Sequence, residues 1–464
     1  MCDISLVMIT SNFIVIYIYS NIVKNNKTLH RIIVVGGGAG GLELAARLGN
    51  KLGKKKNAKI TLVDATLTHL WKPLLHEVAA GTLNSYEDEL SYLALAHKNH
   101  FRFRLGRMDG LDRKNKEISL SPTLDSNNVE YIPRRTFKYD TLIFGIGSIA
   151  NDFGIQGIKE HCMFLDTRVE ADLFHQFFFK SIYKAHAQRS IRREGQLRIS
   201  IAGAGATGVE LSAELHEAIN QLFEFGLDGF PKKHIKITII EASERILPAL
   251  PMELSKKTTN ILNKIDIEVL TGHRICEATE LGYVTDKSGL IPSEIKIWAA
   301  GIKAPDFLAK IDGLETNGIN QLVVQETLET THDENIFALG DCAACLMKGK
   351  DQNVPPRAQA ANQQATMLVK TIINRMNNKP LPIYTYVDYG SLINLSRYST
   401  VGNMMGYLCG KRAGSIMIEG MLARFVYWSL YKTHQVVIQG IIRVTLMTVA
   451  NILTQKTKPR MKLH

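Results

Sequence analysis

Short apolar strands alternate with longer amphipathic helices along most of the chain, and one strand–turn–helix–strand order occurs twice. Residues 31–64 carry the strand RIIVV, a glycine-rich turn, a helix and the strand KITLVD. Residues 197–240 repeat this order with LRISIA, GAGATG, a long helix and KITII. Strands that alternate with helices form parallel sheets covered by helices, so the pattern predicts an α/β fold with two Rossmann-like units. Further elements are expected as strands at 139–147, 294–300 and 335–339 and as a helix at 355–377.

The pattern changes at Met421, where a segment with two unlike faces begins. The next segment, 436–453, is interrupted by polar residues too often to cross a bilayer. Such helices are typical of segments that lie in the membrane interface. The alternative is an amphipathic helix packed on the protein or on another subunit. One stripe of the first helix holds Arg424, Trp428, Tyr431, Lys432 and Gln435, whereas Leu422, Phe425, Val426 and Leu430 lie away from it.

The composition fits a globular protein and adds one constraint, a basic excess. The 464 residues predict two or three domains, and 45% hydrophobic with 22% charged residues allow a full core. A net charge of +12 indicates an anionic partner: nucleic acid, an acidic membrane or a phosphate-bearing ligand. Because the tail is both apolar and basic, an anionic lipid membrane is favoured, and no motif supports nucleic acid. After Glu419 there is no Asp or Glu, while Arg424, Lys432, Arg443, Lys456, Lys458, Arg460 and Lys462 follow.

The N-terminal segment Ile4–Val23 is largely apolar and long enough to span a bilayer. It lacks the basic start and the small-residue cleavage site of a signal peptide. If it spans, the basic residues Lys24, Lys27 and Arg31 would keep the main body cytoplasmic. The alternative is an upstream extension that is disordered or not made in the cell.

The first glycine turn has the spacing of a dinucleotide site. Gly36 and Gly38 would allow a tight turn and close approach of a diphosphate, and Gly41 would allow the helix to pack on the strand. The helix N-terminus would then face the diphosphate. Asp64 ends the next strand, where a carboxylate can accept hydrogen bonds from ribose hydroxyls.

The second turn repeats this arrangement with Gly203, Gly205 and Gly208, and Glu241 ends its second strand. Two complete units on one chain predict two bound dinucleotides. A carboxylate at Glu241 would bond a 2′-hydroxyl but repel a 2′-phosphate, which favours NADH over NADPH. Two such sites indicate electron transfer between a nicotinamide and a flavin, for which the protein supplies geometry and needs no acid or base.

The six cysteines are sparse and scattered, which fits a reducing compartment. Cys342 and Cys345 form a Cys-x-x-Cys, but no second pair completes a zinc site, so no metal is expected. The pair could be a redox dithiol or bind copper. The simpler hypothesis is that both are small residues at a helix start.

The chain resembles the flavoprotein superfamily that has two dinucleotide-binding domains. There an FAD domain comes first, an NADH domain is inserted, and the chain returns to finish the FAD domain. The stretch NIFALGD at 335–341 resembles the point of return, and YDTLIFGIGS at 139–148, which includes Gly147, resembles the strand where the domains cross. The resemblance implies that Asp341, after Gly340, holds the ribityl–pyrophosphate part of FAD.

Within that superfamily the chain resembles the type II NADH:quinone oxidoreductases of the gamma-proteobacterial kind, from about Arg31 to His464. It departs from them at Ile146, where a small residue often stands, and in its N-terminal apolar segment. The matching stretches are GGGAGGL at 36–42, which includes Gly40, HLWKPLLHEVA at 69–79, GATGVELSAEL at 205–215, ILPALP at 246–251, WAAGIKAPDF at 298–307, which includes Gly301, PPRAQAA at 355–361 and SRYSTVG at 396–402.

The resemblance implies a single-subunit enzyme that passes two electrons from NADH through noncovalent FAD to a membrane quinone such as ubiquinone, without pumping protons. It implies a peripheral position on the cytoplasmic face of the inner membrane through C-terminal helices, and a homodimer. The expected parts are an N-terminal extension at 1–30, an FAD domain at 31–155 and 319–385, an NADH domain at 156–318, and a membrane-anchoring region at 386–464.

Three residues are the candidates for catalysis. The resemblance places Gln359 and Gln363, at i and i+4 of one helix, beside the flavin and near the quinone, where an amide can bond a quinone carbonyl. It places Glu210 near the nicotinamide and quinone, in a role in proton delivery. The alternatives are a helix cap or buried amide for the glutamines and a surface glutamate for Glu210.

Two other functions remain open. A sulfide:quinone oxidoreductase could recruit Cys162 and Cys345, yet that chemistry has no use for a nicotinamide site. An NADH-sensing flavoprotein would be reduced by NADH and would stay reduced. A disulfide reductase would carry a cysteine pair in the first helix of the FAD domain, and residues 41–50 contain none.

Overall fold

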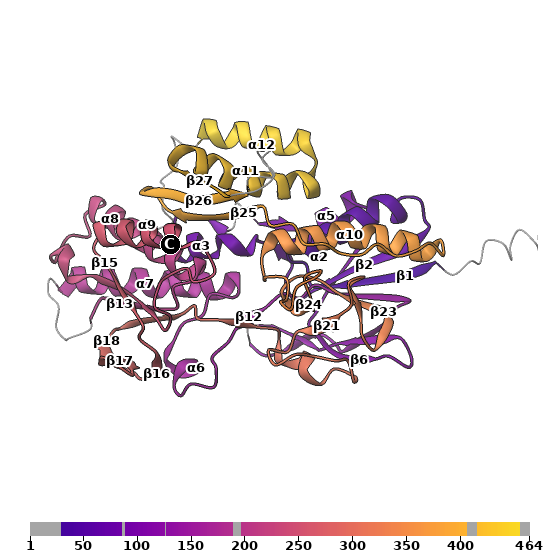
Figure 1. Ribbon diagram of the computed structural model, residues 1–464, viewed down its shortest axis with the longest axis horizontal. Helices are drawn as coiled ribbons and strands as arrows, with labels where there is room; N and C mark the ends of the chain where they lie inside the picture. The colour runs from indigo at the N-terminus through magenta and orange to yellow at the C-terminus, as the bar shows by residue number, and fades with distance from the viewer. Residues whose placement is uncertain (1–28, 86–88, 126, 189–195, 406–414, 455–464) are drawn as a thin grey trace, which may run out of the picture.

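Two sheets, one mixed with parallel central strands and one fully parallel, form the centres of two lobes that lie side by side, with a third unit across them (Figure 1). The structure, a computed structural model, describes residues 29–85, 89–125, 127–188, 196–405 and 415–454. The apolar segment 4–23 and the last basic residues of the tail, 456–462, lie outside the described residues.

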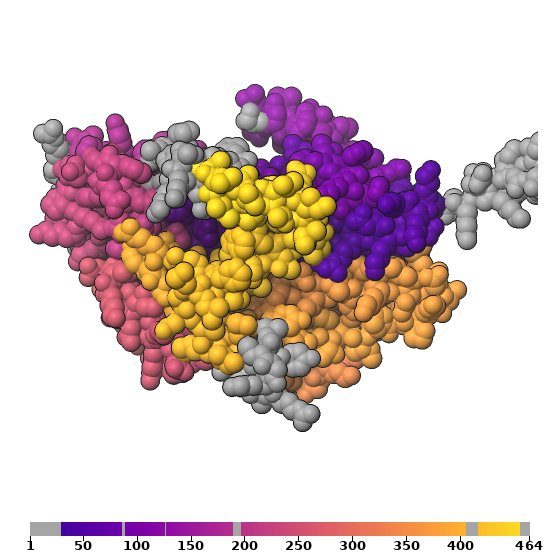
Figure 2. Space-filling view, turned by 90° about the horizontal axis from the view of Figure 1, so that it is seen from above, coloured from indigo at the N-terminus to yellow at the C-terminus, as the bar shows by residue number. Residues whose placement is uncertain are grey.

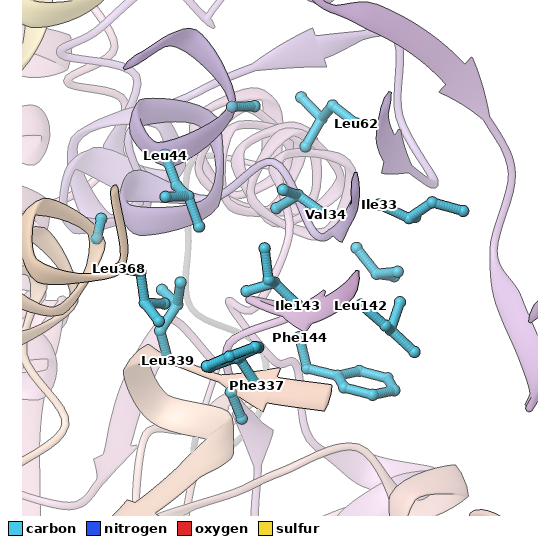
Figure 3. Packing of buried hydrophobic residues seen from close by; sticks show 14 of the residues in the cluster. Ile33, Val34, Leu44, Leu62, Leu142, Ile143, Phe144, Phe337, Leu339 and Leu368 are labelled. Carbon is cyan, nitrogen blue, oxygen red and sulfur yellow. The ribbon is translucent and has the colours of Figure 1, made fainter. Parts of the chain in front are cut away.

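The first lobe contains an eight-stranded sheet whose central strands are parallel. Both faces of these strands are covered, which is why runs such as Ile32–Val35 are apolar at every position. The helices α2 (Ala39–Leu48) and α10 (Ala358–Met376) pack together and bury Leu44 and Leu368 against the sheet (Figure 3). In spatial order the strands are β24 (Ala343–Cys345), β21 (Leu322–Val324), β22 (Glu329–Thr330), β23 (Asp333–Ala338), β11 (Thr141–Phe144), β1 (His30–Val35), β2 (Ala58–Asp64) and β5 (Arg102–Leu105).

The second lobe contains a four-stranded parallel sheet with the same kind of buried centre. Its order is β15 (Ile267–Thr271), β14 (Lys236–Glu241), β13 (Arg198–Ala202) and β19 (Ile295–Trp298). The helices of this lobe are α6 (Ile158–His161), α7 (Arg168–Gln188), α8 (Ala206–Glu224) and α9 (Met252–Lys264). Both predicted Rossmann-like units are therefore present, and the α/β fold is confirmed.

The chain crosses between the lobes at a short antiparallel pair, β12 (Ile149–Ala150) with β20 (Ile302–Lys303). Directly after β20, Ala304 and Leu308 are fully buried in the core of the first lobe. The chain thus returns to the first lobe before residue 318, where the sequence placed the end of the inserted domain. The sequence did not reveal this earlier return because residues Asp306–Lys310 form a short 3-10 helix, which is too short to show a helical or strand periodicity.

The third unit is an antiparallel sheet followed by two helices. The strands are β25 (Gly390–Leu395), β26 (Ser399–Met405) and β27 (Ser415–Glu419), and the helices are α11 (Gly420–Gln439) and α12 (Ile441–Thr454). Ile393 and Val401 of the sheet join the core of the second lobe, whereas α11 contacts α2 of the first lobe. Seen from above, the C-terminal helices lie across the junction of the two lobes (Figure 2). In the part of the chain that the structure describes, no helix combines the length and the apolarity that crossing a membrane requires.

Smaller elements complete the lobes. Helix α3 packs against α7 and α8 and so joins the first lobe to the second. The elements are α3 (Leu75–Ala80), α5 (Tyr92–Lys98), β3 (Thr68–His69), β4 (Leu90–Ser91), β6 (Met108–Asp112), β7 (Glu117–Leu120), β8 (Thr123–Leu124), β9 (Glu130–Ile132), β10 (Arg135–Lys138), β16 (Ile275–Ala278), β17 (Gly282–Thr285) and β18 (Gly289–Pro292).

Candidate functional site

The first glycine turn joins β1 to α2 and leaves the helix N-terminus open. Gly36 has a φ of +98°, and a Cβ there would collide with the carbonyl of Gly145. A Cβ on Gly41 would collide with the carbonyl of Gly36, so the helix can pack this closely only on a glycine. Gly38 precedes the helix, and the nearest atom to a Cβ there lies 3.9 Å away. The free N–H groups of this turn therefore face space that a diphosphate can fill.

The second turn, between β13 and α8, has the same geometry. Gly203 has a φ of +95° and lies against the backbone of Ala299, and Gly208 lies against the carbonyl of Gly203. Around Gly205, at the start of the helix, a Cβ would meet nothing within 4 Å. The two turns thus leave two helix starts open in the same way, a geometry that suits an anion.

Each turn is fastened to the carboxylate that ends the following strand. Asp64 Oδ2 accepts a hydrogen bond from the Gly37 N–H at 2.6 Å, and Glu241 Oε2 accepts one from the Ala204 N–H at 2.7 Å. Both carboxylates therefore lie beside their glycine turn, the position from which a carboxylate can accept hydrogen bonds from a ribose. Arg245 is directed elsewhere, because its guanidinium donates to the carbonyls of Leu247, Pro248 and Leu250.

The point of return brings two distant segments together. Ser148 Oγ donates to Asp341 Oδ2 at 2.9 Å across 193 positions of the sequence, and Gly340 N–H donates to the buried Gln364 Oε1 at 2.7 Å. Gly147 and Gly340 have φ values of +71° and +69°. The structure therefore gathers Gly147, Gly340 and Asp341 at one place, next to the first lobe's sheet.

Two of the predicted glycines have a packing role that the sequence does not reveal. A Cβ on Gly40 would collide with Leu339 and press on the carbonyl of Ala361, so this glycine lets α2 approach α10. Gly301 has a φ of +72°, and the ring of Phe153 occupies the space where its side chain would be.

Gln359 and Gln363 both bind the backbone of residues 387–390. Gln363 donates to the Val387 carbonyl at 2.7 Å and accepts from its N–H at 3.0 Å. Gln359 donates to the Gly390 carbonyl at 3.1 Å and accepts from the Tyr389 N–H at 3.1 Å. Their role towards a quinone stays a prediction. Gln364, which sequence reasoning did not select, is the glutamine that contacts the turn before Asp341.

Glu210 is buried, so the alternative of a surface glutamate is wrong. Its side chain is 8% exposed, and Oε1 accepts from the Asn394 N–H of β25 at 2.8 Å. Burial raises the pKa of Glu210 to about 8. Glu214 lies one turn further along α8, accepts from Thr82 Oγ1 at 3.0 Å, and has a pKa raised by burial to about 7. Sequence reasoning missed Glu214, although the spacing i, i+4 from Glu210 is a signal that could have selected it.

Three of the cysteines that the structure describes, Cys162, Cys342 and Cys345, are buried and are protonated at neutral pH, whereas Cys276 is exposed. Burial raises the pKa of Cys162, Cys342 and Cys345 to about 11 in each case. Cys342 ends a 3-10 turn, Gly340–Cys342, and Cys345 lies in the strand β24. The simpler hypothesis that both cysteines are small residues at a helix start is therefore wrong, because one ends a 3-10 turn and the other lies in a strand.

The tail helix α11 turns only the second half of its predicted stripe, with Tyr431 and Gln435, towards the protein, whereas Arg424 and Trp428 are exposed. The residues that this half contacts were missed. Trp71 stacks on Tyr431 with ring centroids 5.3 Å apart, and His69 Nε2 lies 3.0 Å from His434 Nε2. Because the two histidines are 365 positions apart, no local pattern could have paired them.

Comparisons with known proteins agree with this geometry. Residues 30–365 match the family described as pyridine nucleotide-disulphide oxidoreductase. The chain is 39% identical to the type II NADH:quinone oxidoreductase of Haemophilus influenzae over 448 residues, which cover 94% of this chain and 100% of the relative. It is 27% identical to the enzyme of the same name from Staphylococcus aureus over 390 residues, or 82% of this chain and 92% of the relative.

Solved structures show the same fold. The NDH2 of Plasmodium falciparum, solved with NADH, has a TM-score of 0.76 at 19% identity and covers 94% of this chain and 100% of its own. The sulfide:quinone oxidoreductase of Aquifex aeolicus has a TM-score of 0.68 at 16% identity and covers 91% of this chain and 95% of its own.

Proposed function

The chain belongs to the type II NADH:quinone oxidoreductases, and from this membership we propose that it oxidises NADH and reduces a membrane quinone with FAD as its cofactor. The observation that carries the proposal is the pair of open glycine turns, each fastened to its own acid, on one chain. When bound, FAD supplies the two-electron chemistry, because a flavin takes a hydride from a nicotinamide and passes electrons to a quinone.

The first lobe fits FAD. Gly36, Gly38 and Gly41 leave the start of α2 open to a diphosphate, and Asp64 lies where it can accept from ribose hydroxyls. Asp341, held by Ser148, is the carboxylate that the family uses for the ribityl part. These groups supply backbone donors to phosphate oxygens and carboxylate acceptors to hydroxyls, which matches the chemistry of the cofactor.

The second lobe fits NADH. Gly203, Gly205 and Gly208 repeat the open helix start, and Glu241 is aligned beside it by the Ala204 N–H. A carboxylate there bonds a 2′-hydroxyl and repels a 2′-phosphate. Arg245 cannot compensate for that repulsion without leaving the three carbonyls that it bonds.

Glu210 is suited to deliver a proton to the quinone. Reducing a quinone to a quinol takes two electrons and two protons, and a hydride brings only one of these protons. One proton per turnover must therefore come from the solvent through the protein. With a pKa of about 8, Glu210 is protonated at neutral pH and can still release the proton, and Glu214 beside it can replace that proton.

Gln359 and Gln363 are proposed to contact the quinone from the first turns of α10. Two observations support this position: Ala361, between them, packs against Gly40 and Gly340, and Gln364 binds Gly340. The start of α10 therefore lies beside the FAD site. To bond a quinone carbonyl, either glutamine has to exchange one of its bonds to residues 387–390.

The tail is proposed to lie on the cytoplasmic face of the inner membrane. Three of its polar side chains, His434, Gln435 and Gln439, are buried against the protein. A set of large apolar side chains points outward, although Ile438 and Val444 are buried. Met421 is 89% exposed and Phe425 64% exposed, and neither could be so exposed in water without cost. The outward side chains are Met421, Leu422, Phe425, Trp428, Leu430, Ile441, Ile442, Leu446, Val449, Ile452 and Leu453.

A homodimer is the proposed assembly. Support comes from α7, where Val169, Leu173 and Phe177 recur at every fourth position and are 55%, 55% and 40% exposed. An apolar stripe of this kind is typical of a helix that packs on a partner. The molar mass of the detergent-solubilised protein tests it: twice the mass of one chain supports the dimer, and the mass of one chain contradicts it.

The experiment that tests the function measures reduction of a short-chain quinone by the purified, FAD-bearing protein with NADH, NADPH or sulfide as the donor. Fast turnover with NADH alone is expected. Flavin that NADH reduces but quinone does not reoxidise would instead indicate an NADH sensor. Turnover with sulfide would move the chemistry to the cysteines, whose protonated state at neutral pH argues against it.

A further inference from the structure

Helix α11 contacts the first lobe, which we propose to bind FAD, through a buried pair of histidines. His69 follows β2 in the first lobe and is 3% exposed, while His434 lies in α11 and is 6% exposed. Their Nε2 atoms are 3.0 Å apart, which is a hydrogen-bond distance. The rings of Trp71 and Tyr431 stack beside the pair and exclude water from it.

The direction of this hydrogen bond follows from the other nitrogen of His69. His69 Nδ1 lies 2.9 Å from the carbonyl oxygen of Gly37, which can only accept. Nδ1 therefore carries the hydrogen, and Nε2 of the neutral ring is left as an acceptor. His434 Nε2 must then donate to it. Burial lowers the pKa of His69 to about 4 and of His434 to about 3, so both rings are neutral at physiological pH.

Through its second nitrogen, His69 connects His434 to the first glycine turn. Gly37 lies between Gly36 and Gly38, and its peptide groups are held on all sides. Its N–H donates to Asp64, and its carbonyl accepts from Tyr92 Oη at 2.8 Å as well as from His69. A shift of this residue would redirect the N–H groups at the start of α2, which are the groups that face a diphosphate.

The end of α11 is fixed to the same lobe by separate contacts. Lys98 Nζ donates to the carbonyl of Gln439, and Asn99 Nδ2 donates to the carbonyl of Ile438 at 3.2 Å. These donors cap the last carbonyls of the helix, as a lysine or an amide commonly does. Since α11 is held there independently of His434, a change at position 434 can alter the histidine bond while the helix stays docked.

We propose that His434 is a positioning residue for FAD: through His69 it holds the Gly37 carbonyl, so that the docked membrane helix α11 sets how tightly the cofactor is bound. The proposal rests on the binding of FAD at the first glycine turn. It makes the third unit part of the cofactor site as well as a surface for the membrane.

The test compares FAD release from the full-length protein and three variants, by the recovery of free-flavin fluorescence at a fixed temperature. His434→Leu removes the donor, and His69→Asn keeps a donor for Gly37 but cannot reach His434. Each is expected to release FAD roughly 10-fold faster, the size of one lost buried hydrogen bond. His434→Gln places an amide N–H near the position of Nε2 and is expected to restore slow release.

Two controls separate the possible causes. His216→Leu removes a histidine hydrogen bond to Tyr398 in the second lobe, and it is expected to leave FAD release unchanged. The double variant His69→Asn/His434→Leu is expected to match each single variant, because both remove the same bond.

Each outcome bears on the proposal. A wild-type protein that binds no FAD would overturn the proposed function, whatever the variants do. A wild type that retains FAD together with a His434→Leu variant that retains it equally well would overturn the present inference alone. Release as fast from His434→Gln as from His434→Leu would also overturn it, since the loss would then reflect packing. The unfolding midpoint of each variant is measured by far-UV circular dichroism, and it should lie above the temperature at which FAD release is followed.

Discussion

Asp64 and Glu241 occupy equivalent positions in the two lobes, and each accepts a hydrogen bond from the N–H that follows the first glycine of its turn. The bonds are 2.6 Å and 2.7 Å long. Each acid therefore aligns its turn, and we propose for each a second task, to accept hydrogen bonds from a ribose. A substitution at either position tests both tasks together.

Glu241→Arg is expected to move the preference of the enzyme towards NADPH. The change removes the repulsion of a 2′-phosphate and adds a cation, so the ratio of kcat/KM for NADH to that for NADPH should fall by roughly 100-fold. Activity with NADH should also fall, because the Ala204 N–H loses its acceptor. Steady-state kinetics with both nucleotides measure the ratio.

Glu241→Gln is the matched variant for this comparison. It keeps an oxygen for the Ala204 N–H but removes the charge, so it should lose discrimination without gaining strong binding of NADPH. A ratio in Glu241→Arg equal to that of the wild type would contradict the ribose assignment.

Glu210→Gln is expected to slow quinone reduction and to leave flavin reduction by NADH intact. Loss of a proton donor typically costs 10²-fold or more, and we expect roughly 100-fold in kcat. In the wild type, kcat should fall as the pH rises through about 8, where Glu210 loses its proton. Stopped-flow reduction of the flavin and steady-state turnover across pH 6 to 10, an interval of about two units on each side of that pKa, separate the two half-reactions.

The same residue affects stability with a defined sign. The pKa of Glu210 is raised from 4.5 to about 8, so between these values the folded protein binds a proton that the unfolded chain does not. Stability therefore falls as the pH rises across this window. Glu210→Gln should flatten that fall, and an unchanged slope would contradict the buried, protonated carboxyl.

The local parts of the site could be predicted from the sequence, and the long-range parts could not. The glycine turns and their acids were readable because a tight turn, a helix start and the end of a strand each leave a mark within about 30 residues. The link from Ser148 to Asp341 spans 193 positions and that from His69 to His434 spans 365, so neither leaves a periodic signal. The fold class needed only the alternation of strands and helices, whereas the point of return after β20 needed the packing of Ala304.

In the tail, the sequence predicted two sides of helix α11 but not their orientation. Helical spacing separated the stripe of Tyr431 and Gln435 from the side of Leu422 and Phe425, and the structure keeps these four residues apart. Arg424 and Trp428, which the spacing assigned to the same stripe, are exposed. Spacing could not say which side faces the protein. That choice depends on Trp71, His69 and Lys98, which supply an aromatic face and hydrogen-bonding groups for the polar stripe.

The histidine pair predicts a loss of stability in acid. The folded-state pKa values of His69 and His434, about 4 and about 3, lie below the ordinary 6.5 because of burial. As the pH falls below 6.5 the unfolded chain gains protons that the folded chain refuses, so stability declines, by at most about 1.4 kcal/mol per pH unit for each histidine. Thermal unfolding at pH 7.5, 6.0 and 5.0, roughly one unit above and below the ordinary histidine pKa, measures the slope. His69→Asn/His434→Gln, which has no titrating group at either position, should show a flatter slope, and equal slopes would refute the assignment.

The outward side of α11 and α12 predicts how the protein binds membranes. Deleting 421–464 would remove the proposed membrane surface, but it would also remove His434, so a change in attachment could not be told from a change in cofactor binding. Leu422→Glu/Phe425→Glu changes only side chains that are 60% and 64% exposed. A charge at each of these positions would have to enter the lipid, so binding to anionic phospholipid vesicles should weaken by roughly 100-fold or more, while FAD content stays unchanged. Leu281→Glu, at an equally exposed leucine of the second lobe (64%), is the control and should bind as the wild type does. Vesicle co-sedimentation with anionic and with neutral lipid separates the contribution of the apolar side chains from that of the basic residues. Weaker binding to neutral vesicles would support a contribution of the basic residues of the tail. Undiminished binding of the double variant to both kinds of vesicle would contradict the membrane surface and leave the outward side of α11 to a protein partner.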